Sequence, residues 1–296
     1  MGKWVWLGWA LKDAAWASSS CALEFNHDQL LVVKSTEATL VVDTGASNSV
    51  VFEEGGKQRS RPISSASKKV QYQEISVEAN ESDRKIQLVC WPKPVEIGNV
   101  LVSTGGLGGP MNVEGILGLG RAHTTPWTSF SVQVPADAGE TGTLILTTSH
   151  LRPVPPSNLL PLCSHDYWAT TLVGLKIGAQ PIVLPGGPTA VVFDTGSNFF
   201  GISSALFKVV SIDLSGCPAP TLTVILAGGV ELVYESSSYS EDPECGSLAV
   251  GEIDQKSLGD LAHGEVFVVG TRGLRGKTLS IFKSAKSEFG FVMAVN

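Results

Sequence analysis

The sequence has little of what several functional classes require. It contains no stretch of about 18 uncharged apolar residues, so we expect no integral membrane span. Positive charge is also scarce, because 21 lysines and arginines stand against 28 aspartates and glutamates, a formal net charge of −7. Binding to nucleic acid needs clustered positive charge. We therefore expect no nucleic-acid partner and read the acidic balance as ordinary surface charge.

Motifs for metal and serine-based hydrolysis are missing as well. The sequence has no HExxH motif, no Cys-x-x-Cys pair and no Gly-x-Ser-x-Gly motif. The glycine-rich residues 105–110 lack the Gly-Lys-Ser/Thr continuation of a phosphate-binding loop. We predict neither a metal site nor a cofactor. The five histidines, His27, His123, His150, His165 and His263, are interpreted as surface or satisfied core groups.

What the chain does contain is typical of a β-rich protein. Short runs of Val, Ile, Leu and Thr alternate with turn signals from 32 glycines and 16 prolines. A chain of 296 residues can bury a sizeable core in one or two domains. The pattern predicts a mostly β fold with short helices.

The most informative stretch is LVVDTGASNSVV at residues 40–51. It reads as a buried strand, a tight turn that carries Asp43, and a return strand. An isolated Asp-Thr-Gly turn is commonly an aspartate that caps its own backbone. A carboxylate between apolar strands nevertheless costs desolvation free energy, which favours a use for it.

A second copy of this pattern changes the interpretation. Residues 190–203 read AVVFDTGSNFFGIS, with Asp194 in the turn. Each copy is followed by two aliphatic residues and a glycine, because Gly118 lies 75 residues after Asp43 (43 to 118) and Gly270 lies 76 residues after Asp194 (194 to 270). The two halves therefore look like copies of one ancestral unit.

This doubled pattern resembles the pepsin-like aspartic proteases. TGTLILT at residues 141–147, Tyr167-Trp168 and LVGLKIG at residues 172–178 also match that family. The resemblance implies an all-β, bilobal pepsin-like acid protease fold with an internal duplication. We expect an N-terminal β lobe over residues 22–150 and a C-terminal β lobe over residues 151–296, connected by the proline-rich residues 152–161.

The resemblance also implies that Asp43 and Asp194 are the catalytic residues of one shared site. Two carboxyl groups about 3 Å apart cannot both ionise, so such a pair shares a proton and supplies a base and an acid together. We expect Thr44 and Thr195 to hydrogen-bond across the lobes. The two glycines of the motifs, Gly45 and Gly196, would let backbone amides approach the carboxylates.

The two motifs differ in the residue after the glycine. Ser197 can donate a hydroxyl hydrogen bond to Asp194, whereas Ala46 occupies the equivalent place after Asp43. Losing one donor to an ionised carboxylate raises its affinity for protons. We therefore predict an activity optimum less acidic than in relatives with a hydroxyl on both sides.

The flap that covers substrate in this family is altered here. Alternation over residues 68–88 suggests a hairpin, and Tyr72 is the candidate flap tyrosine. Gln73 and Glu74 follow it in place of glycines, and Val50 stands where relatives have a supporting tryptophan. Tyr72 is equally well explained as a half-buried strand aromatic.

The cysteines fit the resemblance in part. Residues 217–245 resemble the family's second-lobe disulfide loop, which implies a bridge between Cys217 and Cys245; the alternative is two reduced buried thiols in a cytosolic protein. Three cysteines remain, so they cannot all pair with one another. The sequence does not say which of Cys21, Cys90 and Cys163 meet.

Residues 1–21 are either a signal peptide or an N-terminal extension. They combine a basic start, a short apolar centre and a small-residue exit, although Lys12 and Asp13 interrupt them. A signal peptide would fit a secreted, endomembrane, vacuolar or lysosomal protein.

Two functions follow from these patterns. The first is an aspartic endopeptidase, a monomer that hydrolyses a peptide or protein substrate in the cleft between the lobes. The second is a pepsin-like binding or inhibitor protein without proteolysis, because a fold does not guarantee a function. Two intact Asp-Thr-Gly motifs favour the enzyme, and the altered flap favours the binding protein.

Overall fold

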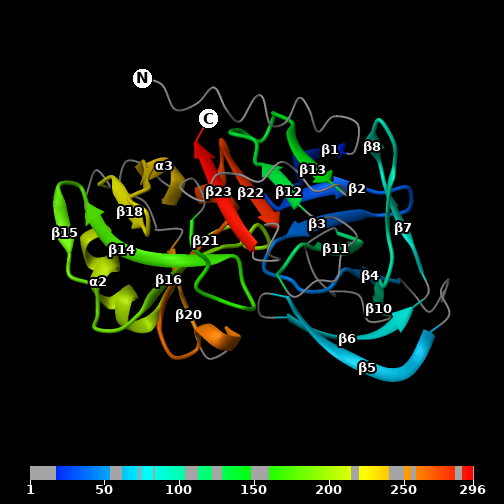
Figure 1. Cartoon of the computed structure of the whole chain (residues 1–296), viewed down its shortest axis with the longest axis horizontal. Coiled ribbons are helices and arrows are strands. Elements are labelled where there is room, and N and C mark those ends of the chain that lie inside the picture. Colours follow the sequence, from blue (N-terminus) through cyan, green and yellow to red (C-terminus); the bar gives the residue numbers. More distant parts are fainter. Residues whose placement is uncertain are drawn as a thin grey trace.

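The structure, a computed structural model, shows two β-rich lobes side by side (Figure 1). Strands greatly outnumber helices, so the predicted mostly β, bilobal fold is confirmed. The structure describes residues 18–53, 62–72, 75–82, 84–103, 113–121, 129–147, 160–214, 220–239, 250–254, 258–283 and 289–295.

The larger sheet fills the first lobe. Among the described residues, its strands are β1 (Ser18–Phe25), β2 (Leu31–Lys34), β3 (Thr39–Asp43), β4 (Val50–Phe52), β5 (Pro62–Tyr72), β6 (Ile75–Ser82), β8 (Cys90–Trp91), β10 (Leu101–Ser103), β11 (Gly115–Gly118), β12 (Ser129–Gln133), β13 (Gly142–Thr147), β22 (Lys277–Lys283) and β23 (Phe289–Val295). Their order is β23-β22-β12-β13-β1-β2-β3-β11-β4-β10-β6-β5, with β8 paired to β1. A separate pair joins β7 (Ile86–Leu88) to β9 (Val95–Ile97).

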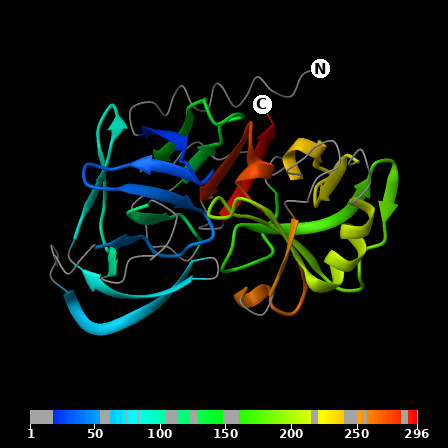
Figure 2. The ribbon, with the colours of Figure 1, turned by 180° about the vertical axis from the view of Figure 1, so that it is seen from behind.

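The second lobe is built on a smaller sheet, seen from behind in Figure 2. Its strands are β14 (Ala169–Ile177), β15 (Gln180–Ile182), β16 (Thr189–Phe193), β17 (Phe200–Ser203), β18 (Leu222–Leu226), β19 (Glu231–Tyr234), β20 (Val250–Ile253) and β21 (Glu265–Val269). The helical elements are α2 (Ser204–Leu214), α3 (Ser236–Tyr239), the 3-10 helix η3 (Gly259–Leu261) and α4 (Thr271–Leu274). Within the described residues, no helix has the length and apolar character needed to cross a bilayer.

The same four-strand arrangement occurs once in each lobe. In the first lobe, β11 runs parallel to β3 and antiparallel to β4, and β10 runs parallel to β4. In the second lobe, β21 runs parallel to β16 and antiparallel to β17, and β20 runs parallel to β17. This repetition is the internal duplication that the doubled motif predicted.

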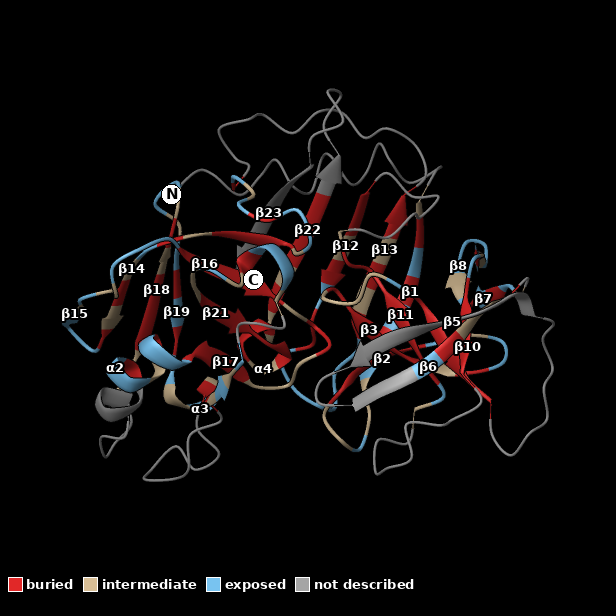
Figure 3. Cartoon of the chain, turned by 90° about the horizontal axis from the view of Figure 1, so that it is seen from below, coloured by how far each residue is buried: buried red, intermediate tan, exposed pale blue. Residues whose placement is uncertain are grey.

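The strands that lead to the two aspartates, β3 and β16, are buried on both faces (Figure 3). In β3, Leu40 and Val42 face the main core, whereas Val41 faces a smaller cluster. In β16, Val191 and Phe193 face the main core, and the alternate residues Ala190 and Val192 face another cluster. Strands buried on both faces have continuous apolar sequences, which explains why these runs do not alternate.

The N-terminal lobe begins earlier than expected. β1 starts at Ser18 and pairs with β13, and within it Cys21 lies opposite Leu144. A division after residue 21 would cut this strand in two, so residues 18–21 belong to the folded lobe. The rest of the expected signal or extension, residues 1–17, lies outside the described residues.

The last strands of the chain connect the lobes. β22 pairs with β12, and β23 pairs with β22, so both belong to the larger sheet (Figure 1). The expected C-terminal lobe of residues 151–296 therefore contributes two strands to the sheet of the other lobe. One hydrophobic cluster accordingly runs through both lobes and includes Leu144, Phe193 and Ile281.

Candidate active site

Each predicted catalytic aspartate lies where a central strand ends. Asp43 is the last residue of β3, and its carbonyl accepts a hydrogen bond from the Leu119 N–H at 2.7 Å. Asp194 directly follows β16, and its N–H donates to the Val269 carbonyl at 3.0 Å. The aliphatic-aliphatic-glycine pattern forms β11 in the first half and the end of β21 in the second. These segments lie beside β3 and β16 and hold the backbone of each acid.

The two acid loops face each other at close range. A Cβ atom added to Gly196 would lie 2.3 Å from Cγ of Asp43, and one added to Gly45 would lie 2.9 Å from Oδ1 of Asp194. Since real Cβ atoms do not approach so closely, each loop needs glycine to reach the opposite carboxyl group. Asp194 is therefore close enough for its charge and its side chain to raise the pKa of the Asp43 carboxyl.

Thr44 and Thr195 join the loops through reciprocal hydrogen bonds. The N–H of Thr44 donates to Oγ1 of Thr195 at 3.1 Å, and the N–H of Thr195 donates to Oγ1 of Thr44 at 3.0 Å. The hydroxyl of Thr44 donates to the Phe193 carbonyl, and that of Thr195 donates to the Val42 carbonyl. Both threonines are fully buried, so these bonds are not exchanged with water.

The hydrogen bonds to the two carboxylates are unequal. Oδ1 of Asp43 accepts the N–H groups of Gly45 and Ala46, both at 2.8 Å. Asp194 accepts the Gly196 N–H at 2.9 Å and the Ser197 hydroxyl at 3.0 Å, on different oxygens. Within the described part of the chain, no hydroxyl donates to Asp43. The sequence difference between Ala46 and Ser197 thus corresponds to a difference in the donors that the two acids receive.

The surroundings of Asp43 favour its protonated form. Burial raises the pKa of the Asp43 carboxyl well above its ordinary value, and the charge of Asp194 and the hydrogen bond to it raise it further. The N–H groups of Gly45 and Ala46 act in the opposite direction but are outweighed. Two adjacent carboxyls of which one retains its proton can supply an acid and a base at one place.

A tyrosine of the second lobe lies close to the pair. Tyr167 stands two residues before Ala169, the first residue of β14, and Ala169 pairs with Val192, two residues before Asp194. Burial raises the pKa of the Tyr167 hydroxyl, and the charge of Asp194 adds to this effect. Sequence reasoning used Tyr167 only as a family landmark and did not place it near the two acids.

The candidate flap is present as a backbone hairpin. β5 and β6 pair antiparallel, with Tyr72 opposite Ile75 at the end of the hairpin. The side chain of Tyr72 lies outside the described residues, so its role stays a prediction. β6 pairs with β10, which runs beside β4, and this connects the hairpin to the sheet that carries Asp43.

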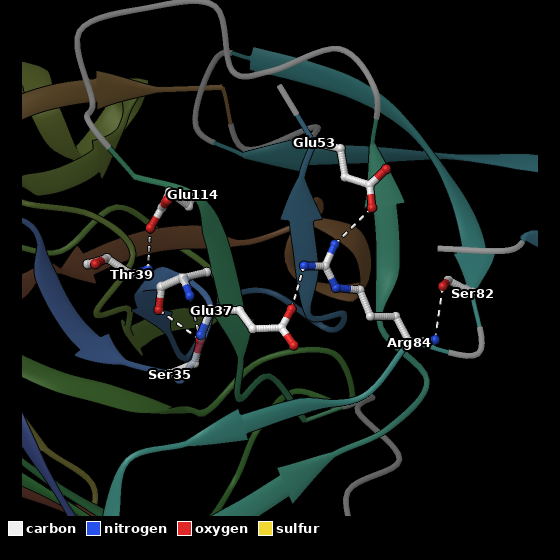
Figure 4. A network of polar contacts seen from close by, with 8 residues as sticks. Ser35, Glu37, Thr39, Glu53, Ser82, Arg84 and Glu114 are labelled. Carbon is white, nitrogen blue, oxygen red and sulfur yellow. Dashed lines mark hydrogen bonds and ion pairs between the residues drawn. The ribbon is translucent and has the colours of Figure 1, made fainter. Parts of the chain in front are cut away.

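An ion-pair network anchors the base of this hairpin (Figure 4). Arg84 lies two residues beyond the end of β6, and its N–H donates to the Ser82 hydroxyl at 2.9 Å. Its guanidinium binds Glu53, just after β4, and Glu37, in the turn before β3, both at 2.8 Å. The side chains of Arg84 and Glu53 are 12% and 4% exposed, so their ion pair is shielded from water.

The structure answers the question that the sequence left open about three of the five cysteines. Cys21 of β1 and Cys90 of β8 form a disulfide bond, and their strands pair at these residues. Cys163 is a free thiol on the surface. The predicted bridge between Cys217 and Cys245 lies outside the described residues and stays a prediction.

Comparisons with known proteins support the fold. No family model matches the chain, and no curated protein matches its sequence. Among solved structures, the crystal structure of basic 7S globulin from soybean matches with a TM-score of 0.67 and 11% sequence identity, over 93% of this chain and 94% of that chain. At this identity the likeness shows the fold alone. The chain has a mostly β, bilobal fold of the pepsin-like type.

Proposed function

We propose that the protein is an aspartic endopeptidase that hydrolyses extended peptide segments between its lobes. The observation that carries the proposal is the close approach of the two acid loops, in which the glycine of each loop faces the carboxyl group of the other. The reciprocal bonds of Thr44 and Thr195 support it, because they hold the two acid loops in one fixed relation. Such preorganisation is what a reaction on a bound water molecule requires.

The chemistry follows from the shared proton. The ionised carboxylate takes a proton from the bound water as the water oxygen attacks the peptide carbonyl carbon, and the protonated carboxyl donates to the carbonyl oxygen. The tetrahedral intermediate then collapses. Its C–N bond breaks as the carboxyl that took the proton from water passes it to the nitrogen, while a hydroxyl of the intermediate returns its proton to the other carboxylate. An amine and a carboxylic acid are released. The pair begins and ends with one proton, so no other reactant is needed.

The pair shares one proton, so one carboxyl donates to the carbonyl oxygen while the other accepts the proton from water, and these roles belong to the pair and not to either residue. The Ser197 hydroxyl and Gly196 N–H orient the carboxyl group of Asp194. The raised pKa of Asp43 also favours activity at mildly acidic pH, in line with the prediction from Ala46. The pair titrates as one unit, so the pH profile reports both groups together.

Cleavage of denatured casein across pH 3 to 7 tests the proposal. We expect wild-type protein to cut casein and both Asp43→Asn and Asp194→Asn to lose the activity, because an amide can neither share the proton nor act as the base. Casein cleavage that survived in both variants would assign the activity to another site or to a contaminant. A profile centred near pH 2 to 3 would contradict the expected shift of the optimum.

A second function is a pepsin-like binding protein without proteolysis. Two observations favour it: Ala46 leaves Asp43 without a hydroxyl donor among the described residues, and one of the solved structures with a similar fold is named a globulin. This function predicts a stable complex with peptide that persists uncut at every pH. Mass spectrometry of a peptide library after incubation separates the two functions, since only the peptidase generates new termini.

We further propose an oxidising compartment and a monomer. The disulfide between Cys21 and Cys90 fits a secreted or vacuolar protein, because such bonds persist outside the reducing cytosol. The substrate would be a peptide or protein segment lying between the lobes. Light scattering of purified protein tests the monomer directly.

A further inference from the structure

A tryptophan outside the two acid loops touches the opposite lobe. Trp168 immediately precedes β14 of the second lobe, and its side chain is only 3% exposed. Its indole Nε1–H donates to the Leu119 carbonyl of the first lobe at 2.7 Å. Its ring also meets the ring of Phe130 in β12 edge to face, with centroids 5.8 Å apart. These two contacts fix the side chain, because a buried indole N–H needs an acceptor.

The backbone on either side of this contact leads to the two acids. The N–H of Leu119 donates to the carbonyl of Asp43 at 2.7 Å. The carbonyl of Trp168 accepts the N–H of Phe193 at 3.1 Å, and Phe193 directly precedes Asp194. A continuous path of hydrogen bonds therefore runs from one acid loop to the other through Leu119 and Trp168. It is separate from the direct threonine contact.

The segment that carries Trp168 is held by a carboxylate of η3. The Ser164 hydroxyl oxygen accepts the N–H groups of Asp166 and Tyr167 at 3.1 and 3.0 Å, and the hydroxyl donates to Oδ1 of Asp260 at 2.6 Å. The His165 N–H donates to the other oxygen of Asp260. In return, the Asp260 N–H donates to Oδ2 of Asp166 at 3.2 Å. Residues 164–166, just before Trp168, are thus bound to Asp260 by hydrogen bonds in both directions.

Asp260 remains charged under the conditions that the acid pair needs. Burial alone would raise the pKa of its carboxyl, but the hydrogen bonds from the His165 N–H and the Ser164 hydroxyl outweigh burial and lower it. Its hydrogen bonds therefore persist at mildly acidic pH, where a peptidase of this kind would act.

We propose that Trp168 is a positioning residue that sets the spacing of the Asp43 and Asp194 loops, and that Asp260 holds the segment that carries it. The inference rests on the proposed function, since it gives Trp168 a part in the action of the acid pair. Both acids must reach one water molecule, and a displacement of about 1 Å can cost on the order of 100-fold in rate.

The first test compares two tryptophans. Trp168→Phe keeps a ring against Phe130 but removes the N–H donor, and Trp91→Phe is the control because Trp91 is 78% exposed on β8. We expect Trp168→Phe to lower kcat/KM about 10- to 100-fold, mainly through kcat, and Trp91→Phe to leave it within about twofold. Asp260→Ala should act in the same direction, and Asp260→Asn, which keeps one acceptor oxygen, should recover part of the loss.

The second test does not depend on cleavage. Carboxyl carbons of 13C-labelled aspartate are titrated by NMR in the wild type and in both tryptophan variants. In Trp168→Phe, we expect the apparent pKa of Asp43 to fall towards its ordinary value, because the Asp194 charge has moved away; in Trp91→Phe it should not change.

An unaltered titration in a folded Trp168→Phe variant would overturn the inference, even if its rate or stability fell, because Trp168 would then contribute packing alone. A wild type that never cleaved peptide would overturn the proposed peptidase, while this titration would still decide the role of Trp168.

Discussion

Thr44 and Thr195 exchange hydrogen bonds across the boundary between the lobes, with each N–H donating to the hydroxyl oxygen of the other residue at 3.1 and 3.0 Å. The relationship is symmetric, although the residues lie 151 positions apart in the chain. Each hydroxyl also donates to a strand carbonyl of the opposite lobe. Every threonine therefore acts as an acceptor and a donor at once, which neither valine nor alanine can do.

The first prediction concerns this exchange. Thr44→Val keeps the shape of the side chain but leaves the buried N–H of Thr195 without its acceptor, so we expect the free energy of unfolding to fall by about 1–3 kcal/mol. Thr44→Ser keeps the hydroxyl and loses only a methyl group, at a cost of about 1 kcal/mol. Urea denaturation at pH 6 measures both. Equal losses in the two variants would mean that the hydrogen bonds contribute nothing beyond packing.

The second prediction concerns the glycine that faces Asp43. In Gly196→Ala the new methyl group would start 2.3 Å from Cγ of Asp43, so the loops must separate. We expect a loss of about 1–3 kcal/mol in stability, and peptidase activity should fall with it. Gly98→Ala is the matched control because no atom lies within 4 Å of its added Cβ, and that variant should be unchanged or slightly more stable. Retention of full activity by Gly196→Ala would contradict the close approach of the loops.

The third prediction follows from the raised pKa of Asp43. Below the pKa of an unfolded aspartate, about 3.9, Asp43 is protonated in both states. As pH rises, the unfolded chain loses this proton while the folded site keeps it, so stability falls by up to about 1.4 kcal/mol per pH unit until the folded pKa is passed.

Asp43→Asn removes this dependence. The variant should therefore be more stable than the wild type at pH 7, and the difference should disappear near pH 3. Urea denaturation across this range measures the effect, with Asp137→Asn, at an exposed acid in the turn after β12, as the control. A difference between Asp43→Asn and wild type that stayed constant with pH would mean that Asp43 ionises normally.

The local parts of the candidate site could be predicted from the sequence. The apolar runs before Asp43 and Asp194 are continuous because their strands are buried on both faces, and the following Gly118 and Gly270 occur at the same spacing in each half. A single Asp-Thr-Gly turn would be ambiguous, but its occurrence in both halves made the prediction of an acid pair specific. The turn residue Ser197 could also be placed, because its distance from Asp194 is set by a few backbone torsions.

The parts that depend on distant segments could not be predicted. The contact between Ser164 and Asp260 joins positions 96 residues apart, and neither residue carries a recognisable motif. The pairing of Cys21 with Cys90 depends on how β8 lies against β1, which no local pattern encodes. For the same reason, the resemblance did not reveal that β22 would pair with β12 of the other lobe.

The fourth prediction concerns the ion-pair network at the base of the β5–β6 hairpin. Arg84→Met removes the cation from the nearly buried carboxylate of Glu53, and breaking such a pair from one side costs about 3–5 kcal/mol. Glu37→Gln breaks only the more exposed pair and should cost about 0–1 kcal/mol.

The double variant Arg84→Met/Glu53→Gln should be more stable than Arg84→Met, because the buried carboxylate charge that faced Arg84 is gone. Hydrogen exchange should show faster exchange in β6 in Arg84→Met than in Glu37→Gln. Equal exchange in the two variants would mean that Arg84 does not anchor the hairpin.

The fifth prediction concerns the disulfide bond between Cys21 and Cys90 and the number of free thiols in the protein. The bond between Cys21 and Cys90 closes a loop with a sequence separation of 69, so the double variant Cys21→Ala/Cys90→Ala should lose roughly 4 kcal/mol through the greater entropy of its unfolded chain. Alkylation of unfolded, unreduced protein followed by mass spectrometry tests the bonding. One modified cysteine, Cys163, is expected if Cys217 and Cys245 also pair; three would disprove that second bridge and leave the first intact. Modification of Cys21 or Cys90 themselves would contradict the disulfide bond between β1 and β8, which would then be joined by their backbone pairing without a covalent link.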